Sequence, residues 1–364
     1  MINETNLGMC EKKVIFLVDQ LFYDDNHIGV RKKVQNQIRL FQNNGMEAKI
    51  LSFVWKEGKP VFDIPSDTNI LYFRNVGFSI KFAQKLFEIR KKIPSIRIIM
   101  EIPTYPFKGE QKNLSIKEKI NNCVSKIVWK YCIDQFVVIG MNRKKTRLYG
   151  IPVIHATNGI NFDEENVALS NGLGNTINMI CVSGCYFWHG YDRIIKGLSD
   201  YYQHSKNPQD INVYVVGEGD CLQEYKELAQ KLQLIEKHIF FCGKLEGEAL
   251  QRIYNKCSLA IEVLAGHRKG LSLSCSLKSR EYAAKGLPMI TSIDLDISHD
   301  DSKKYILKVP ADDSAIDIDE IVSFWKRIYY EDEMAKVREE IRNTFSKYCS
   351  WDIVFNDVIK YMKE

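Results

Sequence analysis

Long apolar runs and clustered cysteines are both missing from this sequence of 364 residues. It contains no run of about eighteen apolar residues, so it predicts no membrane-spanning helix. The first eleven residues are polar and the next apolar run is short, which argues against a secretory signal peptide. The ten cysteines are scattered singly, without a Cys-x-x-Cys pair, which argues against a zinc ligand set and indicates reduced thiols. We expect a cytoplasmic protein.

A strong charge of either sign is missing as well. The formal net charge of +5 does not demand a nucleic-acid partner, and we expect none, but it suits an anionic ligand or an anionic membrane surface. Hydrophobic residues make up 45% of the chain and charged residues 27%, as in a folded globular protein. The length favours two domains over one.

Apolar runs alternate with helical patterns throughout the first part of the chain. A buried strand at 14–18 is followed by a loop, Gly29, a helix that begins at Val30, and a second strand. Only one glycine marks that loop, so the dinucleotide-binding fingerprint is absent. Further strands are expected at 69–73, 97–100, 135–139 and 154–160.

The second part repeats this layout after a polar, glycine-bearing segment at 164–175, which we interpret as a linker. Strands are expected at 178–182, 213–216, 239–241, 259–263 and 287–291, each followed by a helical pattern. The alternation predicts an α/β protein with two Rossmann-like, doubly wound domains. The predicted boundaries are 1–165 for the first domain, 176–340 for the second and 341–364 for a C-terminal helix.

The segment 266–290 has the features of an anion site. Ser276 is a suitable N-cap for a short helix, and Gly286 with the proline after it ends that helix. A helix N-terminus offers free N–H groups and the positive end of the dipole, which favour a phosphate. Glu281, one turn into the helix, suits a neutral hydroxyl. Diphosphate plus hydroxyl suggests a nucleotide sugar.

Four cations surround this helix start: Arg268, Lys269, Lys278 and Arg280. The alternative is a solvated basic face, which is equally compatible with the local pattern.

Polar side chains also follow the expected strands of the first domain. Arg74, Glu101 and Tyr105 fall at or just beyond carboxyl ends of strands, where open parallel sheets bind ligands. The alternative is that the prolines at 103 and 106 stiffen a turn and that Glu101 caps a helix.

An amphipathic, lysine-bearing helix is expected at 115–132. Such a helix suits an anionic lipid surface, although helices of this kind more often cover a sheet.

Metal chemistry and other catalytic motifs have weak support. Asp294-Leu295-Asp296 and Asp317-Ile318-Asp319 are Asp-x-Asp triplets, but neither lies in the expected phosphate loop, and we predict no metal. No nucleophile elbow is present. His189 begins a helix beside Trp188, so packing or capping is the favoured interpretation.

With these motifs in place, the chain resembles the family 4 glycosyltransferases of the GT-B fold. The resemblance is carried by Gly217-Glu218-Gly219, by Phe241-Cys242-Gly243, and by the helix from Lys278 to Pro288, in order and spacing. The combination of Trp188-His189-Gly190-Tyr191-Asp192-Arg193 with Lys278-Ser279-Arg280-Glu281-Tyr282 resembles the branch that acts on bacterial capsules, exopolysaccharides and related surface glycans. The resemblance implies two domains facing a cleft, with the C-terminal helix packed on the first.

The implied activity is retaining, metal-independent, hexosyltransferase-type glycosyl transfer (EC 2.4). The donor is a nucleotide sugar, a UDP-sugar before a GDP-sugar, and no other cofactor is implied. The acceptor is a glycan or lipid-linked oligosaccharide in surface polysaccharide synthesis, which also implies peripheral contact with the cytoplasmic face of the inner membrane.

Site residues follow from the same resemblance. Arg193 and Lys278 match the diphosphate-binding cations, Glu281 matches the ribose-binding glutamate, and Glu101 is the candidate that orients the acceptor together with Arg74 and Tyr105. The implied donor-binding residues are Gly29, Gly217, Arg268, Lys269, Gly270, Leu271, Ser272, Lys278 and Glu281.

The sequence departs from the family at one position, because Leu273 stands where the first of two paired glutamates is expected. The rival interpretations are a sugar-nucleotide epimerase of the same fold and a non-catalytic partner subunit.

Overall fold

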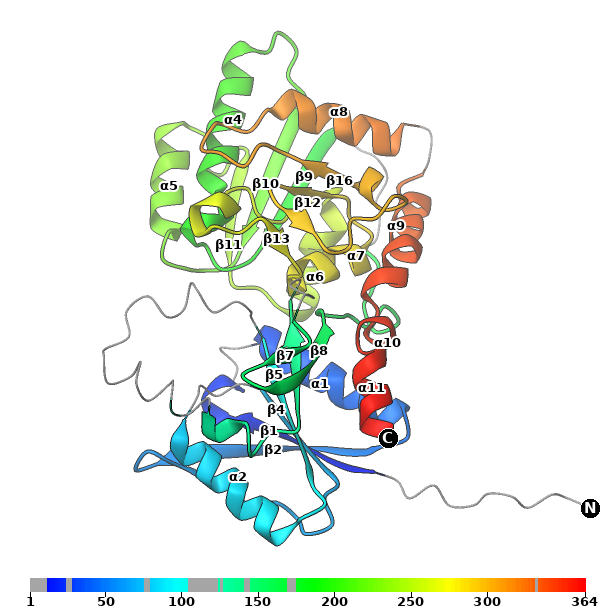
Figure 1. Cartoon of the computed structure of the whole chain (residues 1–364). Coiled ribbons are helices and arrows are strands. Elements are labelled where there is room, and N and C mark those ends of the chain that lie inside the picture. Colours follow the sequence, from blue (N-terminus) through cyan, green and yellow to red (C-terminus); the bar gives the residue numbers. More distant parts are fainter. Residues whose placement is uncertain are drawn as a thin grey trace, which may run out of the picture. The chain divides into compact units, whose positions relative to one another are not determined.

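The computed structural model describes residues 12–23, 28–74, 79–103, 124, 127–140, 145–168, 175–330 and 333–364. The chain forms two compact units (Figure 1). Unit 1 consists of Met1–Asn158 together with Trp351–Glu364, and unit 2 consists of Gly159–Ser350. In the described ranges no helix is long and apolar enough to cross a membrane.

Unit 1 is built on a sheet whose described strands follow the order β3-β2-β1-β4-β5-β6-β8-β7. The strands are β1 (Lys13–Asp19), β2 (Glu47–Lys56), β3 (Lys59–Val61), β4 (Ile70–Arg74), β5 (Arg97–Ile102), β6 (Gln135–Ile139), β7 (Arg147–Leu148) and β8 (Ile151–Ala156). The six central strands are parallel, and β3 and β7 pair antiparallel at the edges. Burial on both faces explains why β1, β4, β5 and β6 are nearly continuous apolar runs.

Helices cover both faces of this sheet. Within the described ranges, unit 1 includes α1 (Ile28–Asn43), α2 (Ile80–Lys92), α10 (Trp351–Val354) and α11 (Asn356–Lys363), with a short 3-10 helix η1 (Gln20–Phe22). Phe41 of α1 packs on Phe16 and Tyr72 on one face. On the other face Phe82 of α2 stacks on Trp129, with 5.8 Å between the ring centres.

Unit 2 has a second sheet, of parallel strands in the order β11-β10-β9-β12-β14-β16. The strands are β9 (Thr176–Val182), β10 (Asp210–Val216), β11 (Ile239–Gly243), β12 (Leu259–Ile261), β14 (Met289–Thr291) and β16 (Ile306–Lys308). β13 (Leu273–Ser274) and β15 (Asp294–Leu295) form a separate pair. From β9 the chain winds first toward β11 and then toward β16, so the strand order reverses between β9 and β12. Such a switch point is where open α/β sheets bind ligands.

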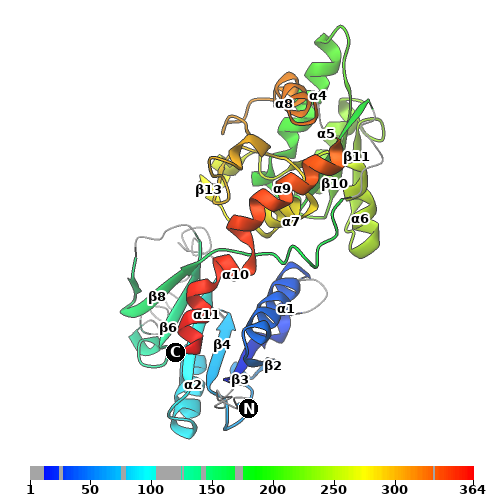
Figure 2. The same cartoon turned by 90° about the vertical axis from the view of Figure 1, so that its right-hand side faces the viewer.

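The helices of unit 2 lie in two layers. They are α4 (Tyr191–His204), α5 (Leu222–Lys231), α6 (Gly247–Lys256), α7 (Leu277–Lys285), α8 (Ile318–Tyr329) and α9 (Met334–Cys349), with 3-10 helices η4 (Phe187–His189), η5 (Gly266–Lys269) and η6 (Lys303–Tyr305). One core cluster joins α4, α5 and α8 to the sheet, and the other joins α6, α7 and α9 (Figure 2).

The predicted pair of doubly wound, Rossmann-like domains is confirmed. The bounds of several elements differ from the prediction, among them the following two. The first helix begins at Ile28 and not at Val30, so Gly29 lies in its first turn. The expected strand at 154–160 is shifted to Ile151–Ala156. Most of the amphipathic helix expected at 115–132 lies outside the described residues.

Candidate anion-binding site

The switch point of unit 2 is bordered by the loops that follow β9, β10 and β12. The loop after β9 bonds to the loop after β10 through Cys185 N–H and Glu218 O, at 2.9 Å. Gly217 has a φ of 136°, and a Cβ added there would lie 2.0 Å from Ser183 O. Only glycine permits so close an approach of two backbones. The glycine turn therefore holds the two loops together at the carboxyl edge of the sheet.

The N-terminus of α7 reaches the same edge. Ser276 is its N-cap, and its Oγ accepts from Ser279 N–H at 3.1 Å. Gly286, at a φ of 72°, is the C-cap. Both predicted caps are confirmed. The helix has nine residues, so its first turn provides unbonded N–H groups and the positive end of a dipole.

Lys278 lies in this first turn with its side chain directed back to the sheet. Its Nζ donates to the carbonyl oxygen of Glu262, and Glu262 Oε1 lies 3.9 Å from Nζ. Only 11% of the lysine side chain is exposed. Burial lowers the pKa of Lys278, and the charge of Glu262 opposes that shift. Lys278 is thus a largely enclosed cation beside a helix N-terminus, a combination suited to a phosphate.

Glu262 is a site residue that the sequence analysis missed. It follows β12 directly, and its side chain is fully buried. Ser276 Oγ donates to its Oε1 at 2.6 Å. The available signal was a single charged residue in an otherwise apolar strand, since buried glutamates are rare unless paired. The fold brings Ser276 and Lys278 to Glu262, and its neighbours in the sequence do not indicate these partners.

Arg268 and Lys269 lie on η5, next to η4. Arg268 forms a two-pronged ion pair with Asp192, at 2.8 and 2.9 Å, and its Nε donates to Asp313 at 2.7 Å. These contacts raise the pKa of Arg268, the hydrogen bond to Asp192 most strongly. Lys269 Nζ lies 4.1 Å from the ring centre of Trp188 and is exposed. Lys269 therefore faces solvent at the rim, while Arg268 ties η5 to α4.

Arg193 is fully buried in the first turn of α4. Its guanidinium donates to Leu264 O, to Pro310 O at 2.9 Å and to Ser314 O at 2.7 Å, and it pairs with Asp312 at 3.2 Å. Contact with a diphosphate requires exchange of some of these bonds. Its predicted diphosphate role stays a prediction.

Arg280, like Arg193, is buried and bonded to groups of the protein itself. It is fully buried and forms a two-pronged ion pair with Asp296. The four cations expected around α7 therefore differ in environment: Lys278 and Lys269 border the site, while Arg268 and Arg280 are held in ion pairs.

His189 forms part of the wall beside Lys278. Its Nδ1 accepts from Tyr186 N–H at 3.3 Å, and the side chain is 7% exposed. Burial, followed by the charge of Lys278, lowers its pKa to about 2. The imidazole is neutral in the physiological range, so it adds no charge to the site.

The remaining predicted donor residues of unit 2 lie on the loop before α7 and on α7 itself. Gly270, Leu271 and Ser272 are exposed, and Gly270 is the C-cap of η5. Glu281 is half-buried, and its charge is the second cause, after burial, of the raised pKa of Tyr254. Leu273, where a glutamate was expected, is 37% exposed.

The predicted site residues of unit 1 form a separate group. Glu101 is fully buried: its carboxylate pairs with Lys33 at 2.7 Å and accepts from Gln37 at 2.6 Å and Tyr72 at 2.9 Å. Arg74 is half-buried at the end of β4, in register with Glu101. Gly29 is exposed on α1, and Tyr105 lies outside the described residues.

The two Asp-x-Asp triplets have other uses in the fold. Asp296 pairs with Arg280, Asp294 with Lys308, and Asp317 caps α8 by accepting from Glu320 N–H at 3.1 Å. In the described ranges no group of three or more His, Cys, Asp or Glu residues has a metal-binding arrangement.

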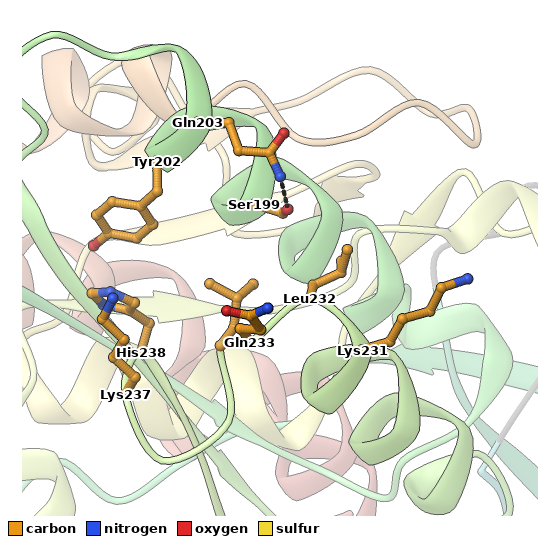
Figure 3. A pocket seen from close by; sticks show the side chains of 9 residues that line it. Ser199, Tyr202, Gln203, Lys231, Leu232, Gln233, Lys237 and His238 are labelled. Carbon is orange, nitrogen blue, oxygen red and sulfur yellow. Dashed lines mark hydrogen bonds between the residues drawn. The ribbon is translucent and has the colours of Figure 1, made fainter.

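A pocket of about 430 Å³ lies elsewhere in unit 2, at the amino-terminal edge of the sheet (Figure 3). Tyr202 and His238 stack in it at 4.1 Å between ring centres, and Gln203 Nε2 donates to Ser199 Oγ at 3.0 Å. Lys231 and Lys237 also line it. None of these residues belongs to the site at α7.

Comparison with solved structures defines the class of fold. A glycosyltransferase from Rickettsia africae ESF-5 aligns with a TM-score of 0.65 at 14% identity, over 97% of this chain and 98% of that chain. The lipopolysaccharide outer core galactosyltransferase WaaB aligns with a TM-score of 0.56 at 11% identity, over 97% and 100%. WaaG, a glycosyltransferase of lipopolysaccharide biosynthesis, aligns with a TM-score of 0.55 at 12% identity, over 96% and 99%. The chain has the two-domain GT-B fold.

Sequence comparison finds a protein-family match within unit 2. Residues 177–325 match the protein-family model described as Glycosyl transferases group 1. No curated protein matches the sequence significantly. The family match covers the switch point, Glu262 and α7, and together with the fold it supports glycosyl transfer as the class of activity.

Proposed function

We propose that this protein is a retaining glycosyltransferase that moves a hexosyl group from a nucleotide sugar, a UDP-sugar before a GDP-sugar, to a glycan or lipid-linked acceptor. The observation that carries the proposal is Lys278 in the first turn of α7, at the switch point of a domain that matches a glycosyltransferase family model. Surface polysaccharide synthesis is the proposed setting. The named lipopolysaccharide transferases among the structural neighbours are consistent with it.

The chemistry requires stabilisation of a leaving group. Cleavage of the glycosyl–phosphate bond leaves the electron pair on the diphosphate and develops positive charge on the sugar. A cation and helix N–H groups aimed at the diphosphate stabilise that charge, and one such contact contributes about 2.7–4 kcal/mol. Lys278 and the start of α7 supply both kinds of group. In the proposed retaining reaction the acceptor attacks from the leaving-group face, and the departing phosphate takes its proton.

In this scheme three charged residues of unit 2 bind parts of the donor. Lys278 binds the diphosphate, and Glu281 binds a hydroxyl of the nucleotide ribose. Lys269, exposed on the rim, supplies a second cation. The loop at 270–272 follows η5, which carries Lys269, and we assign it to the border of the donor site. No resident metal is required by this scheme, because cations of the chain neutralise the leaving group.

The direct test is donor cleavage in the absence of acceptor. A panel of UDP-, GDP- and other activated sugars is incubated with the protein, and nucleotide release and sugar identity are followed. A transferase slowly releases the nucleoside diphosphate with one donor. Interconversion of the sugar would show an epimerase instead, and inertness with every donor would favour a non-catalytic subunit.

Variants connect that activity to the site. Lys278→Ala and Glu281→Ala should each lower turnover or donor affinity, by about 10²–10³ in turnover for the loss of one leaving-group contact at Lys278. Lys256→Ala, which changes an exposed lysine at the end of α6, is the control and should leave both unchanged. Wild-type kinetics in both site variants would contradict the assignment.

A further inference from the structure

One buried oxygen in the site has no partner. Glu262 Oε2 lies out of contact with solvent and accepts no hydrogen bond from any described residue. The other oxygen, Oε1, accepts from Ser276 at 2.6 Å. Unsatisfied buried carboxylate oxygens are costly and uncommon, so such a group calls for a compensating interaction. The nearest cation is Lys278, whose Nζ is 3.9 Å from Oε1.

The lysine is held by the backbone of the same residue. An ammonium group has three N–H donors. One donates to the carbonyl oxygen of Glu262, and no other hydrogen bond of Nζ is found within the described ranges. At 3.9 Å the carboxylate acts through charge and not through a hydrogen bond. Two donors of Lys278 therefore remain available for an anion.

We propose that Glu262 is a positioning residue for Lys278: it holds the ammonium group at the carboxyl edge of the sheet and keeps it protonated for the donor diphosphate. The inference rests on the proposed function, because it assigns Lys278 an anionic ligand. Glu262 itself does not touch that ligand, since its carboxylate is fully buried.

The charges around Lys278 support this assignment. From the sheet side the lysine faces Glu262 on the β12 loop and Cys181 on β9, and from η4 it faces the neutral His189. Glu281 lies one turn further along α7. Burial lowers the pKa of Lys278, and of these groups Glu262 opposes the shift most strongly. Removing the carboxylate charge lowers that pKa further, so the cation is lost at a lower pH.

The test measures nucleoside diphosphate binding between pH 7 and pH 9.5. UDP, GDP and ADP are the probes, and the nucleoside of the best binder is the comparison without phosphate. Glu262→Gln keeps the shape and the acceptor for Ser276 but removes the charge. An opposite charge at this distance shifts a pKa by about one unit or more, so diphosphate affinity should fall about tenfold at the alkaline end. Nucleoside affinity should not change.

Three further variants separate positioning from a merely structural role. Glu262→Asp keeps the charge and should keep the wild-type pH profile. In a Lys278→Met background Glu262→Gln should have no further effect on diphosphate affinity. Glu165→Gln is the matched control, because Glu165 pairs at 2.8 Å with Lys285 at the other end of α7. It should leave the profile unchanged.

The outcomes are distinguishable. If wild type binds no nucleoside diphosphate, the proposed function fails. If wild type binds one and Glu262→Gln has the same pH profile, or loses as much affinity in the Lys278→Met background as alone, the positioning role is overturned. A loss with Glu262→Gln that grows with pH and disappears in the Lys278→Met background supports it.

Discussion

The buried pair of Lys33 and Glu101 shows how the neighbours of one residue set its pKa. Both side chains are almost fully buried, and Glu101 also accepts from Gln37 and Tyr72. Burial alone would raise the pKa of Glu101, but the charges of Lys33 and Arg74 outweigh it, and the pKa is lowered. A depressed carboxyl pKa contributes stability above its usual range near 4.5, and that stability is lost as pH falls.

The pair predicts a large effect from removing one partner alone. Lys33→Met leaves a buried carboxylate without its cation and should lower the free energy of unfolding by about 3–5 kcal/mol. The double variant Lys33→Met, Glu101→Leu removes both charges and should recover part of that loss, because Gln37 and Tyr72 then lose their acceptor. Urea denaturation measures both. A double variant that is no more stable than the single one would show that the unpaired charge of Glu101 does not cause the loss of stability.

His189 makes a second prediction at this scale, for stability against pH. Its folded-state pKa is about 2, mainly because of burial, whereas the unfolded side chain titrates near 6.5. The unfolded chain therefore takes up a proton first, and stability falls as pH decreases below about 6.5, by up to about 1.4 kcal/mol per pH unit. His189→Gln should flatten this part of the profile. Parallel profiles for the two proteins would contradict the assignment.

At the scale of the element, α7 is defined by its two ends. Gly286 has a φ of 72°, and a Cβ there would lie 2.5 Å from the carbonyl oxygen of Arg338. Gly243 has a φ of 64° with nothing within 4 Å of an added Cβ. The two glycines therefore share the backbone conformation but not the close contact with a neighbour.

This difference gives a matched pair of variants. Gly243→Ala should cost only the left-handed conformation, about 1–2 kcal/mol. Gly286→Ala should cost clearly more, because α7 and α9 must also move apart. Thermal unfolding of the two variants measures the difference. Equal losses would mean that the contact with Arg338 is unimportant.

The elements also show what sequence can and cannot predict. The caps of α7 were predictable, because Ser276 and Gly286 act on their own neighbours in the chain. The partners of Arg193 were not, because the carbonyl groups of Leu264, Pro310 and Ser314 meet it only through the fold. Glu262 was missed for the same reason: its position in an apolar strand says nothing about the lysine that reaches it.

At the scale of the whole molecule, the C-terminal segment 351–364 belongs to unit 1. Phe355, the residue that joins α10 to α11 in this segment, is fully buried. Ile353 on α10 is 57% exposed. The alternation of short apolar runs with helical patterns predicted both sheets, because parallel strands that are buried on two faces are nearly continuous in apolar residues. Which unit the last helices join depends on long-range packing.

Substitutions at these two positions test that packing. Phe355→Ala should lower the free energy of unfolding by about 3–5 kcal/mol, and Ile353→Ala should change it by about 0.5 kcal/mol or less. Chemical denaturation measures both. Similar, small losses would indicate that 351–364 contributes little to the core of unit 1.

The most direct test of the central claim is amide hydrogen exchange with and without the nucleotide sugar that the donor panel selects. If the donor diphosphate lies at the start of α7, exchange should slow in 183–190 and 276–281, and Lys278→Met should abolish that protection at the same donor concentration. Protection confined to the pocket of Tyr202 and His238, or its absence from α7 at a saturating donor concentration, would contradict the account.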